Sequence, residues 1–188
     1  DDAKIAAMCP FLIQDPLFNA LLIRSNQGLI RLGQLLGRQA EVARLRQWQE
    51  RALSSFHNKL YHPGKKAYVY FDLREGRQLP EVSSSSFVPL FAGIPDAGTA
   101  REMVGKHFQN GHFSGPEGEY FLCASYDPTA ASFDPGRYWR GPVWINLNWL
   151  IFHGFQRYGF QELADQIRTD TLELLETCGF QEYFDPRR

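Results

Sequence analysis

The stretch GPVWINLNWLIFHGFQRY, residues 141–158, decides the fold that this sequence predicts. It opens on Gly-Pro, is apolar on almost every side, and is followed by Gly159, a residue typical of helix ends. Because a helix that is apolar all round belongs inside a helical protein, we expect a buried inner helix here. Residues 161–178 repeat apolar side chains at helical spacing and predict its antiparallel outer partner.

Two further helical pairs are predicted nearer the N-terminus. Residues 15–37 begin with Asp-Pro and end at glycine, and residues 38–62 continue the helical spacing of apolar side chains until a His-Pro-Gly sequence. Residues 83–93 and 99–110 predict a shorter pair. Between these pairs, residues 66–73 (KAYVYFDL) alternate as a short strand does. The predicted fold class is therefore all-α, with three helical hairpins and a small β element.

The first predicted helix carries one apolar stripe, which consists of Phe18, Leu21, Leu22, Leu29, Leu32 and Leu36. Such a stripe marks the face that a helix buries. Three hairpins do not close a ring, however, and an open stack of three leaves an inner face exposed. We therefore expect that further hairpins, from sequence that is not present here, or a partner chain complete the fold.

Composition excludes several classes of partner. Twenty Lys and Arg against 21 Asp and Glu give a net charge of −1, which favours neither nucleic acid nor an anionic membrane. No apolar run approaches the roughly 20 residues of a membrane span. Five histidines lack the spacing of metal ligands, so we expect no metal and no cofactor. Cys9, Cys123 and Cys178 lie too far apart for a disulfide framework, and we interpret them as buried thiols of a cytoplasmic protein.

Aromatic and polar residues gather just before and within the predicted inner helix. Arg140, Trp144 and Asn148 stand four residues apart, which places them on one face if they are helical, and Tyr138 and Trp139 precede them. A charged group, an indole ring and an amide on one edge suit hydroxyl groups and the flat faces of sugars. The alternative is that Trp144 and Trp149 pack in the core, which is favoured for Trp149, and that Asn148 caps a neighbouring backbone.

Glu182 is the candidate catalytic residue. It follows a helix-ending glycine and lies among Phe180, Tyr183 and Phe184, whose rings we expect to exclude water from its carboxyl group. A carboxyl group in apolar surroundings is a better base. The alternative is a solvated side chain without a catalytic role.

Residues 111–140 show neither a helical nor a strand period. A long irregular stretch in a compact domain is usually either functional or a sign that the element assignment is wrong, and its acids and aromatic residues favour function. Asp127 and Asp134 lie in this stretch and are a second candidate pair of acids. Each precedes a proline, however, so a turn-forming role is favoured for both.

Both clusters resemble glycoside hydrolase family sixty-three, especially its smaller bacterial members that hydrolyse mannosylglycerate or glucosylglycerate. The resemblance rests on residues 138–144 (YWRGPVW), 148–150 (NWL) and 179–186 (GFQEYFDP), which follow the order and separation of the family's motifs. Residues 15–22 (DPLFNALL) are similar as well, so the resemblance spans essentially the whole chain.

The resemblance implies an (α/α)6 toroid and inverting hydrolysis of the glycosidic bond of a small glycoside. Glu182 matches the family's general base, which activates a water molecule. Tyr138 and Trp139 match residues of the sugar and aglycone pocket, with Arg140 and Trp144 beside them. The resemblance therefore implies that the binding surface and the carboxylate belong to one active site.

One part of that active site has no counterpart in this sequence. The family's general acid is an aspartate in a Trp-Asp-x-Ser-Pro type of motif, which is absent here. The resemblance thus implies that residues 1–188 are a single partial catalytic domain, the C-terminal half of the toroid, completed by the missing N-terminal half or by a partner chain. The alternative is a catalytically inactive sugar-binding or scaffold fragment. Which small α-linked glycoside is the substrate stays open.

Overall fold

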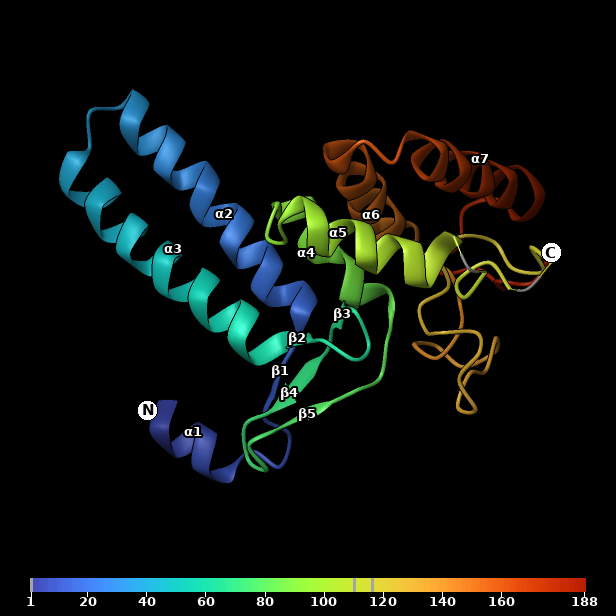
Figure 1. Cartoon of the computed structure of the whole chain (residues 1–188), viewed down its shortest axis with the longest axis horizontal. Coiled ribbons are helices and arrows are strands. Elements are labelled where there is room, and N and C mark those ends of the chain that lie inside the picture. Colours follow the sequence, from blue (N-terminus) through green and yellow to red (C-terminus); the bar gives the residue numbers. More distant parts are fainter. Residues whose placement is uncertain (1, 110, 116) are drawn as a thin grey trace.

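The computed structural model describes residues 2–109, 111–115 and 117–188, and it is mostly helical (Figure 1). Its helices are α1 (Asp2–Met8), α2 (Pro16–Leu35), α3 (Gln39–Leu60), α4 (Val88–Ala92), α5 (Ala97–Val104), α6 (Ile145–Tyr158) and α7 (Gln161–Cys178), with a 3₁₀ turn η1 (Ser84–Phe87) and a π turn η2 (Gly105–Gln109). Its strands are β1 (Ile13–Gln14), β2 (Tyr61–His62), β3 (Ala67–Tyr68), β4 (Tyr70–Asp72) and β5 (Arg77–Leu79).

Three helices form a central row, and a partner helix packs against each end of it. α2 and α3 run side by side at one end of the molecule, α6 and α7 lie at the other end, and α4 and α5 lie between them (Figure 1). α4 packs against both α2 and α6, so these three helices form the row. α3 is the partner of α2, and α7 is the partner of α6. The mostly helical fold that the sequence predicts is confirmed.

The first pair confirms both predicted helices. The Asp15 carboxylate caps α2 by accepting hydrogen bonds from the backbone N–H groups of Leu17 (2.5 Å) and Phe18 (3.4 Å). Pro16 at the first helical position has no N–H group to satisfy. Gly37, in the left-handed region at φ +68°, follows the end of the helix. Local capping therefore fixes both ends of α2.

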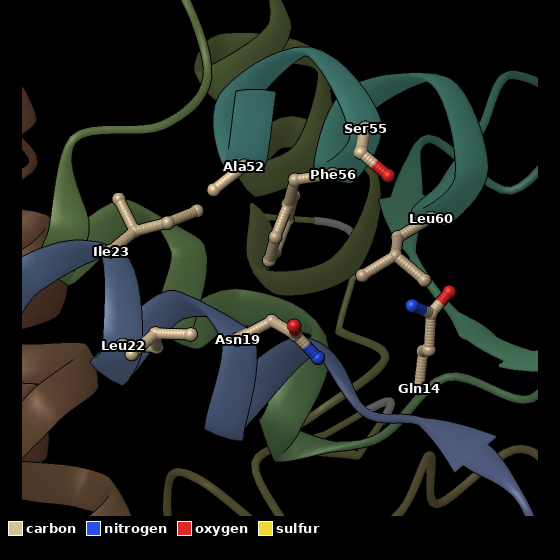
Figure 2. A pocket seen from close by; sticks show the side chains of 8 residues that line it. All are labelled: Gln14, Asn19, Leu22, Ile23, Ala52, Ser55, Phe56 and Leu60. Carbon is tan, nitrogen blue, oxygen red and sulfur yellow. The ribbon is translucent and has the colours of Figure 1, made fainter. Parts of the chain in front are cut away.

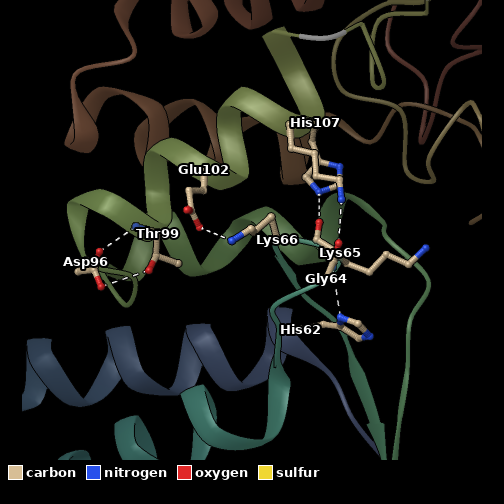
Figure 3. Close-up of polar contacts among 9 residues, drawn as sticks. His62, Gly64, Lys65, Lys66, Asp96, Thr99, Glu102 and His107 are labelled. Atoms are coloured by element: carbon tan, nitrogen blue, oxygen red, sulfur yellow. Dashed lines mark hydrogen bonds and ion pairs between the residues drawn. The ribbon is translucent and has the colours of Figure 1, made fainter.

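The second pair is less regular than predicted. α4 has only five residues, and Gly93 at φ +68° ends it as expected. α4 makes its main contacts with α2 and α6 rather than with α5, so no long hairpin forms. α5 begins directly after its N-cap residue Asp96, whose carboxylate accepts a hydrogen bond from the Thr99 N–H group at 2.8 Å, and it continues as η2 (Figure 3). Asn110, the last residue of this predicted helix, lies outside the described residues.

The third pair closes on a glycine as predicted, but α6 starts at Ile145 rather than at the preceding Gly-Pro. Residues 141–144 lie outside the helix because Val143 forms backbone bridges with Ala124 and with Phe184. Backbone N–H and C=O groups that are used in these bridges are not available for helical hydrogen bonds. The predicted inner helix is therefore shorter at its N-terminal end.

Phenylalanine rings fill the core between the helices. Phe87 meets Phe108 with 4.6 Å between ring centroids and Phe113 with 4.9 Å, and Phe108 meets Phe155 with 4.9 Å. All three contacts have the edge-to-face geometry that aromatic pairs prefer. The four rings are buried, which accounts for part of the chain's high aromatic content.

Two small antiparallel sheets lie on the N-terminal side of the helices (Figure 1). One has the strand order β1-β4-β5, and the other pairs β2 with β3. The strand predicted over residues 66–73 is confirmed as β3 and β4. β1, β2 and β5 were not predicted, because two or three extended residues are too few to show alternation. The helix α1 was not predicted either.

The turn between β2 and β3 is fixed to α5 and η2 by side-chain contacts (Figure 3). Lys66 Nζ lies 2.8 Å from Glu102 Oε2, and His107 Nε2 donates a hydrogen bond to the carbonyl oxygen of Lys65 at 2.8 Å. His107 is buried, and burial lowers the pKa of its imidazole ring. Its Nδ1 atom has no hydrogen-bond partner within the described part of the chain. A second proton on this ring would therefore be buried and unpaired.

The apolar stripe of α2 faces outward and stays uncovered within the described residues. Phe18 is 71% exposed, and Leu22, Leu29 and Leu32 are exposed as well. α2 packs against α3 and α4 through another face, which includes the fully buried Ala20. An open apolar face is what a stack of three helical pairs was expected to leave.

Further expectations concern the cysteines, a membrane crossing, and the location and partners of the chain. Cys123 is buried, but Cys178 is exposed, so the interpretation of all three cysteines as buried thiols is wrong. Within the described residues, no helix combines the length and the apolar character that a bilayer crossing requires. The cytoplasmic location and the absence of a metal, a cofactor and a nucleic-acid partner stay predictions.

Candidate active site

Two segments that are far apart in the sequence meet beside the start of α6. The N–H group of Val143 donates to the carbonyl oxygen of Phe184 at 2.8 Å, and the N–H group of Phe184 donates back at 3.0 Å. The Phe184 side chain is buried in a small core with Phe121, Val143 and Leu174. The segment after α7 is therefore anchored to the segment before α6, which brings the two predicted site clusters together.

Residues 134–141 form a closed loop that presents the first cluster. The N–H group of Asp134 donates to the carbonyl oxygen of Arg140 at 2.8 Å, which joins the two ends of the loop. A Cβ atom on Gly141 would lie 2.7 Å from both the carbonyl carbon of Asp134 and the Cα atom of Pro135. Only glycine allows so close an approach of two backbone segments, so Gly141 is required for this loop.

Asp127 and Asp134 form turns, as the favoured interpretation predicts. Asp134 Oδ1 accepts a hydrogen bond from the N–H group of Gly136 at 3.0 Å. Asp127 Oδ1 accepts hydrogen bonds from the N–H group (2.9 Å) and the hydroxyl group (2.7 Å) of Thr129. Each carboxylate thus binds the backbone two residues further on, which is the usual turn-forming role of aspartate.

Three aromatic rings form the centre of the site. Trp139 and Trp144 stack with 3.9 Å between centroids and 5° between planes, and Tyr138 meets Trp144 edge to face at 4.9 Å. Trp144 Nε1 donates a hydrogen bond to the carbonyl oxygen of Tyr138 at 3.0 Å. Trp139 is 47% exposed, whereas Trp144 is 7% exposed. Trp139 therefore offers a free indole surface, and Trp144 supports it from beneath, so the predicted binding role of Trp144 stays a prediction.

Glu182 reaches this aromatic cluster, as predicted. The Tyr138 hydroxyl group donates a hydrogen bond to Glu182 Oε1 at 2.5 Å, and this bond raises the pKa of Tyr138. The predicted apolar cover of Glu182 is wrong, because Glu182 is exposed, Phe180 is 94% exposed and Phe184 packs into the small core. A polar contact, and not burial by neighbouring rings, therefore sets the surroundings of this carboxylate.

Asn148 and Arg140 differ from their predicted placement. Asn148 is buried, its Nδ2 atom donates to the carbonyl oxygen of Leu122 at 3.0 Å, and its Oδ1 atom accepts from the N–H group of Cys123 at 3.2 Å. Asn148 therefore caps a neighbouring backbone, as the alternative has it, and its substrate-binding role stays a prediction. Trp149 is 56% exposed, so its expected place in the core is wrong. Arg140 lies in the loop before α6 and is exposed, so Arg140, Trp144 and Asn148 share no helical face.

Asp170, which anchors the C-terminal segment, was not predicted from the sequence. Asp170 is buried on α7, its Oδ2 atom accepts a hydrogen bond from the N–H group of Leu122 at 2.8 Å, and its Oδ1 atom lies 2.6 Å from Arg188 Nη2. A signal for it exists, because Asp170 falls between Ile167 and Leu174 on the buried face of α7. An aspartate at such a position is almost never buried without a partner.

A separate cavity lies among β1, α2 and α3 (Figure 2). Its volume is about 70 Å³, and side chains that include Gln14, Asn19 and Phe56 line it. Pockets that bind small molecules usually measure about 300–1,000 Å³, so this cavity is too small for a sugar ring. The aromatic cluster beside α6 remains the candidate site.

Comparison with known proteins connects this arrangement to one family. Residues 1–188 match the family described as the mannosylglycerate hydrolase MGH1-like glycoside hydrolase domain. The mannosylglycerate hydrolase of Rubrobacter radiotolerans is 37% identical over 99% of this chain and 41% of its own length. The glucosylglycerate hydrolase of Mycolicibacterium hassiacum is 30% identical over 99% of this chain and 42% of its own length.

The three-dimensional structure is similar to that of a solved relative as well. The crystal structure of the GH63 mannosylglycerate hydrolase from Thermus thermophilus in complex with Tris is 38% identical, with a TM-score of 0.90 over 100% of this chain and 43% of that chain. This chain therefore spans less than half the length of the relatives that it matches. The resemblance to glycoside hydrolase family sixty-three is confirmed, and the chain belongs to the mannosylglycerate hydrolase MGH1-like glycoside hydrolase family.

Proposed function

We propose that this chain provides the general base and part of the sugar-binding surface of an inverting glycoside hydrolase. The observation that carries the proposal is the contact of Glu182 with Tyr138, next to the exposed indole of Trp139. Hydrolysis of a glycosidic bond needs a carboxylate on one side of the sugar, and aromatic faces hold sugars in place. The proposed substrates are small α-linked glycosides such as mannosylglycerate or glucosylglycerate, after which the relatives are named.

In this proposal Glu182 is the general base. Its Oε1 atom accepts the hydrogen bond of Tyr138, so Oε2 is the atom that takes a proton from water. The water oxygen bonds to the anomeric carbon while the glycosidic oxygen leaves from the opposite face, and a carboxylic acid gives that oxygen a proton. The products are the sugar with inverted anomeric configuration and the free aglycone alcohol. Base and acid then lie roughly 6.5–9.5 Å apart, which leaves room for the water molecule.

The sugar and the aglycone have separate proposed contacts. Trp139 offers one indole face to the C–H groups of the sugar ring, supported from behind by Trp144. Arg140 follows Trp139 directly and is exposed. Its planar guanidinium group suits a carboxylate, which the glycerate part of these substrates carries. We therefore assign Trp139 to the sugar and Arg140 to the charged aglycone.

We also propose that the general acid and the other half of an (α/α)6 toroid come from further sequence or from a partner chain. The chain spans only 41% of the Rubrobacter relative, and the apolar stripe around Phe18 and Leu22 on α2 is exposed. In such a toroid α2, α4 and α6 are inner helices, and residues 1–188 are one partial catalytic domain. The isolated chain is then expected to hydrolyse no glycoside.

The test is Glu182→Gln in the complete enzyme, with mannosylglycerate and glucosylglycerate as substrates. Glutamine keeps the shape of the side chain but takes up no proton, so turnover should fall roughly 10²–10⁴-fold while KM and thermal stability change little. Glu176→Gln is the matched control, since Glu176 is exposed on the preceding helix α7, and it should keep full turnover.

Two outcomes would contradict the proposal. Near wild-type turnover of the Glu182→Gln enzyme would show that another group activates the water molecule. The anomeric configuration of the first sugar released, followed by proton NMR, gives the second check. A product that retains the configuration of the substrate would exclude the inverting mechanism, because inversion follows from direct attack by water.

A further inference from the structure

The hydrogen bond between Tyr138 and Glu182 has a defined direction. A carboxylate only accepts, so the phenolic O–H group of Tyr138 is the donor to Oε1 of Glu182. The oxygen atoms lie 2.5 Å apart, at the short end of the range for a hydroxyl group that donates to a charged oxygen. The two residues come from different segments, so this bond joins the aromatic loop to the segment after α7.

The Tyr138 ring is held from several sides. It meets the ring of Trp144 at 4.9 Å with an interplanar angle of 87° and the ring of Tyr183 at 5.2 Å with an angle of 89°. The indole N–H group of Trp144 also binds the backbone carbonyl oxygen of Tyr138 at 3.0 Å. A ring that is fixed in this way keeps its hydroxyl group at one position.

The Glu182 side chain has fewer constraints. Its backbone is anchored two residues further on, where Phe184 pairs with Val143, but its carboxylate is exposed. The neighbouring Phe180 ring does not cover this carboxylate, since it is 94% exposed. Within residues 2–109, 111–115 and 117–188, the hydroxyl group of Tyr138 is the hydrogen-bond partner of this carboxylate, and Oε2 has none.

We propose that Tyr138 is a positioning residue for the catalytic base. Its hydroxyl group holds Oε1 of Glu182 and thereby aims Oε2 at the attacking water molecule. This inference rests on the proposed role of Glu182 as the base. It assigns to Tyr138 a contribution to the rate of the chemical step.

The experiment is Tyr138→Phe in the complete enzyme, assayed with mannosylglycerate. Phenylalanine keeps the ring contacts with Trp144 and Tyr183 and removes only the hydroxyl donor. We expect kcat to fall about 10–150-fold, the usual size of a hydrogen bond to a charged group, while KM changes less than about 2-fold. Tyr126→Phe is the matched control, because its hydroxyl group contacts Ser132 instead, and it should leave both constants unchanged.

A double-mutant cycle separates this inference from the proposed function. If Tyr138 acts through Glu182, then Tyr138→Phe should cause no further loss of kcat in the Glu182→Gln background. Additive losses, a rise in KM without a fall in kcat, or an unchanged kcat of a folded Tyr138→Phe enzyme would each overturn the inference. Full activity of the Glu182→Gln enzyme alone would overturn the proposed function instead. Thermal unfolding confirms that the variants are folded.

Discussion

A glycine in the middle of α6 sets how closely this helix packs on α4. An ideal Cβ atom on Gly154 would lie 2.8 Å from Leu90 Cβ, 3.0 Å from the backbone nitrogen of Phe91 and 3.2 Å from the carbonyl carbon of Leu90. Two of these three atoms belong to the backbone of α4, so no side-chain rotation relieves the contact. Because carbon atoms in contact lie about 3.5–4.0 Å apart, Gly154→Ala should move the helices apart by up to about 1 Å.

The expected magnitude combines two opposing effects. Overpacking a core destabilises by about 1–3 kcal/mol, and the backbone contacts at Gly154 favour the upper half of this range. Replacing a helical glycine by alanine stabilises by about 0.8–1 kcal/mol. The net effect of Gly154→Ala should therefore be a loss of about 1–2 kcal/mol. Gly28→Ala in α2 is the matched control, because nothing lies within 4 Å of its ideal Cβ atom and only the stabilising effect acts.

Urea unfolding of the complete protein, followed by far-ultraviolet circular dichroism, measures both variants. Their midpoints should move in opposite directions, and the free energies of unfolding should differ by about 2–3 kcal/mol. If Gly154→Ala is as stable as Gly28→Ala, the two helices are not in the tight contact described above, and the reasoning is refuted.

Two further predictions concern buried polar groups. Asn148→Asp places a carboxylate oxygen against the carbonyl oxygen of Leu122, so it should lower the free energy of unfolding in urea by about 1–3 kcal/mol, whereas Asn146→Asp, exposed on the same helix, should change it little. Burial lowers the pKa of His107 from its ordinary value of 6.5, so the unfolded chain binds a proton that the folded chain does not. The resulting stability is present above pH 6.5 and is lost as the pH falls toward the lower pKa of the folded state. His107→Gln keeps a donor for Lys65 but has no proton to gain, so its melting temperature should fall less than that of the wild type between about pH 7 and about pH 5; equal falls would contradict this account.

Helix ends were predictable from the sequence because local chemistry determines them. The Asp15 carboxylate binds N–H groups two and three residues away, and Gly37, Gly93 and Gly159 all take the left-handed conformation that follows a helix. None of these interactions depends on the rest of the fold. The pattern of residue types therefore gives the boundaries of most helices to within a few residues.

The start of α6 was not predictable in the same way. Residues 141–144 form no helical turn because Val143 pairs with Ala124 and with Phe184, both of which are distant in the sequence. Gly-Pro before an apolar run indicates a helix start just as well as it indicates an extended segment. Only the tertiary partners decide between the two.

The same distinction between local and tertiary interactions applies to the roles of the site residues. The motif around Trp139 and the motif around Glu182 identify the two segments that meet. Which side chain is covered depends on how the segments pack, since Trp144 lies beneath Trp139 and Asn148 turns toward the backbone of Leu122. Residue type alone predicts the same binding ability for all of them.

The surroundings of Glu182 were not predictable from its sequence neighbours for the same reason. Its neighbours in sequence were expected to exclude water from the carboxylate, but Phe180 points outward and Phe184 points into the small core, so neither covers it. The group that does reach it is the hydroxyl of Tyr138, 44 residues away, held on the loop that Gly141 allows to close. The closure of that loop and the anchoring of the last segment are therefore what create the environment of this carboxylate. A substitution that opens the loop should affect Glu182 more than one that alters its neighbours in sequence.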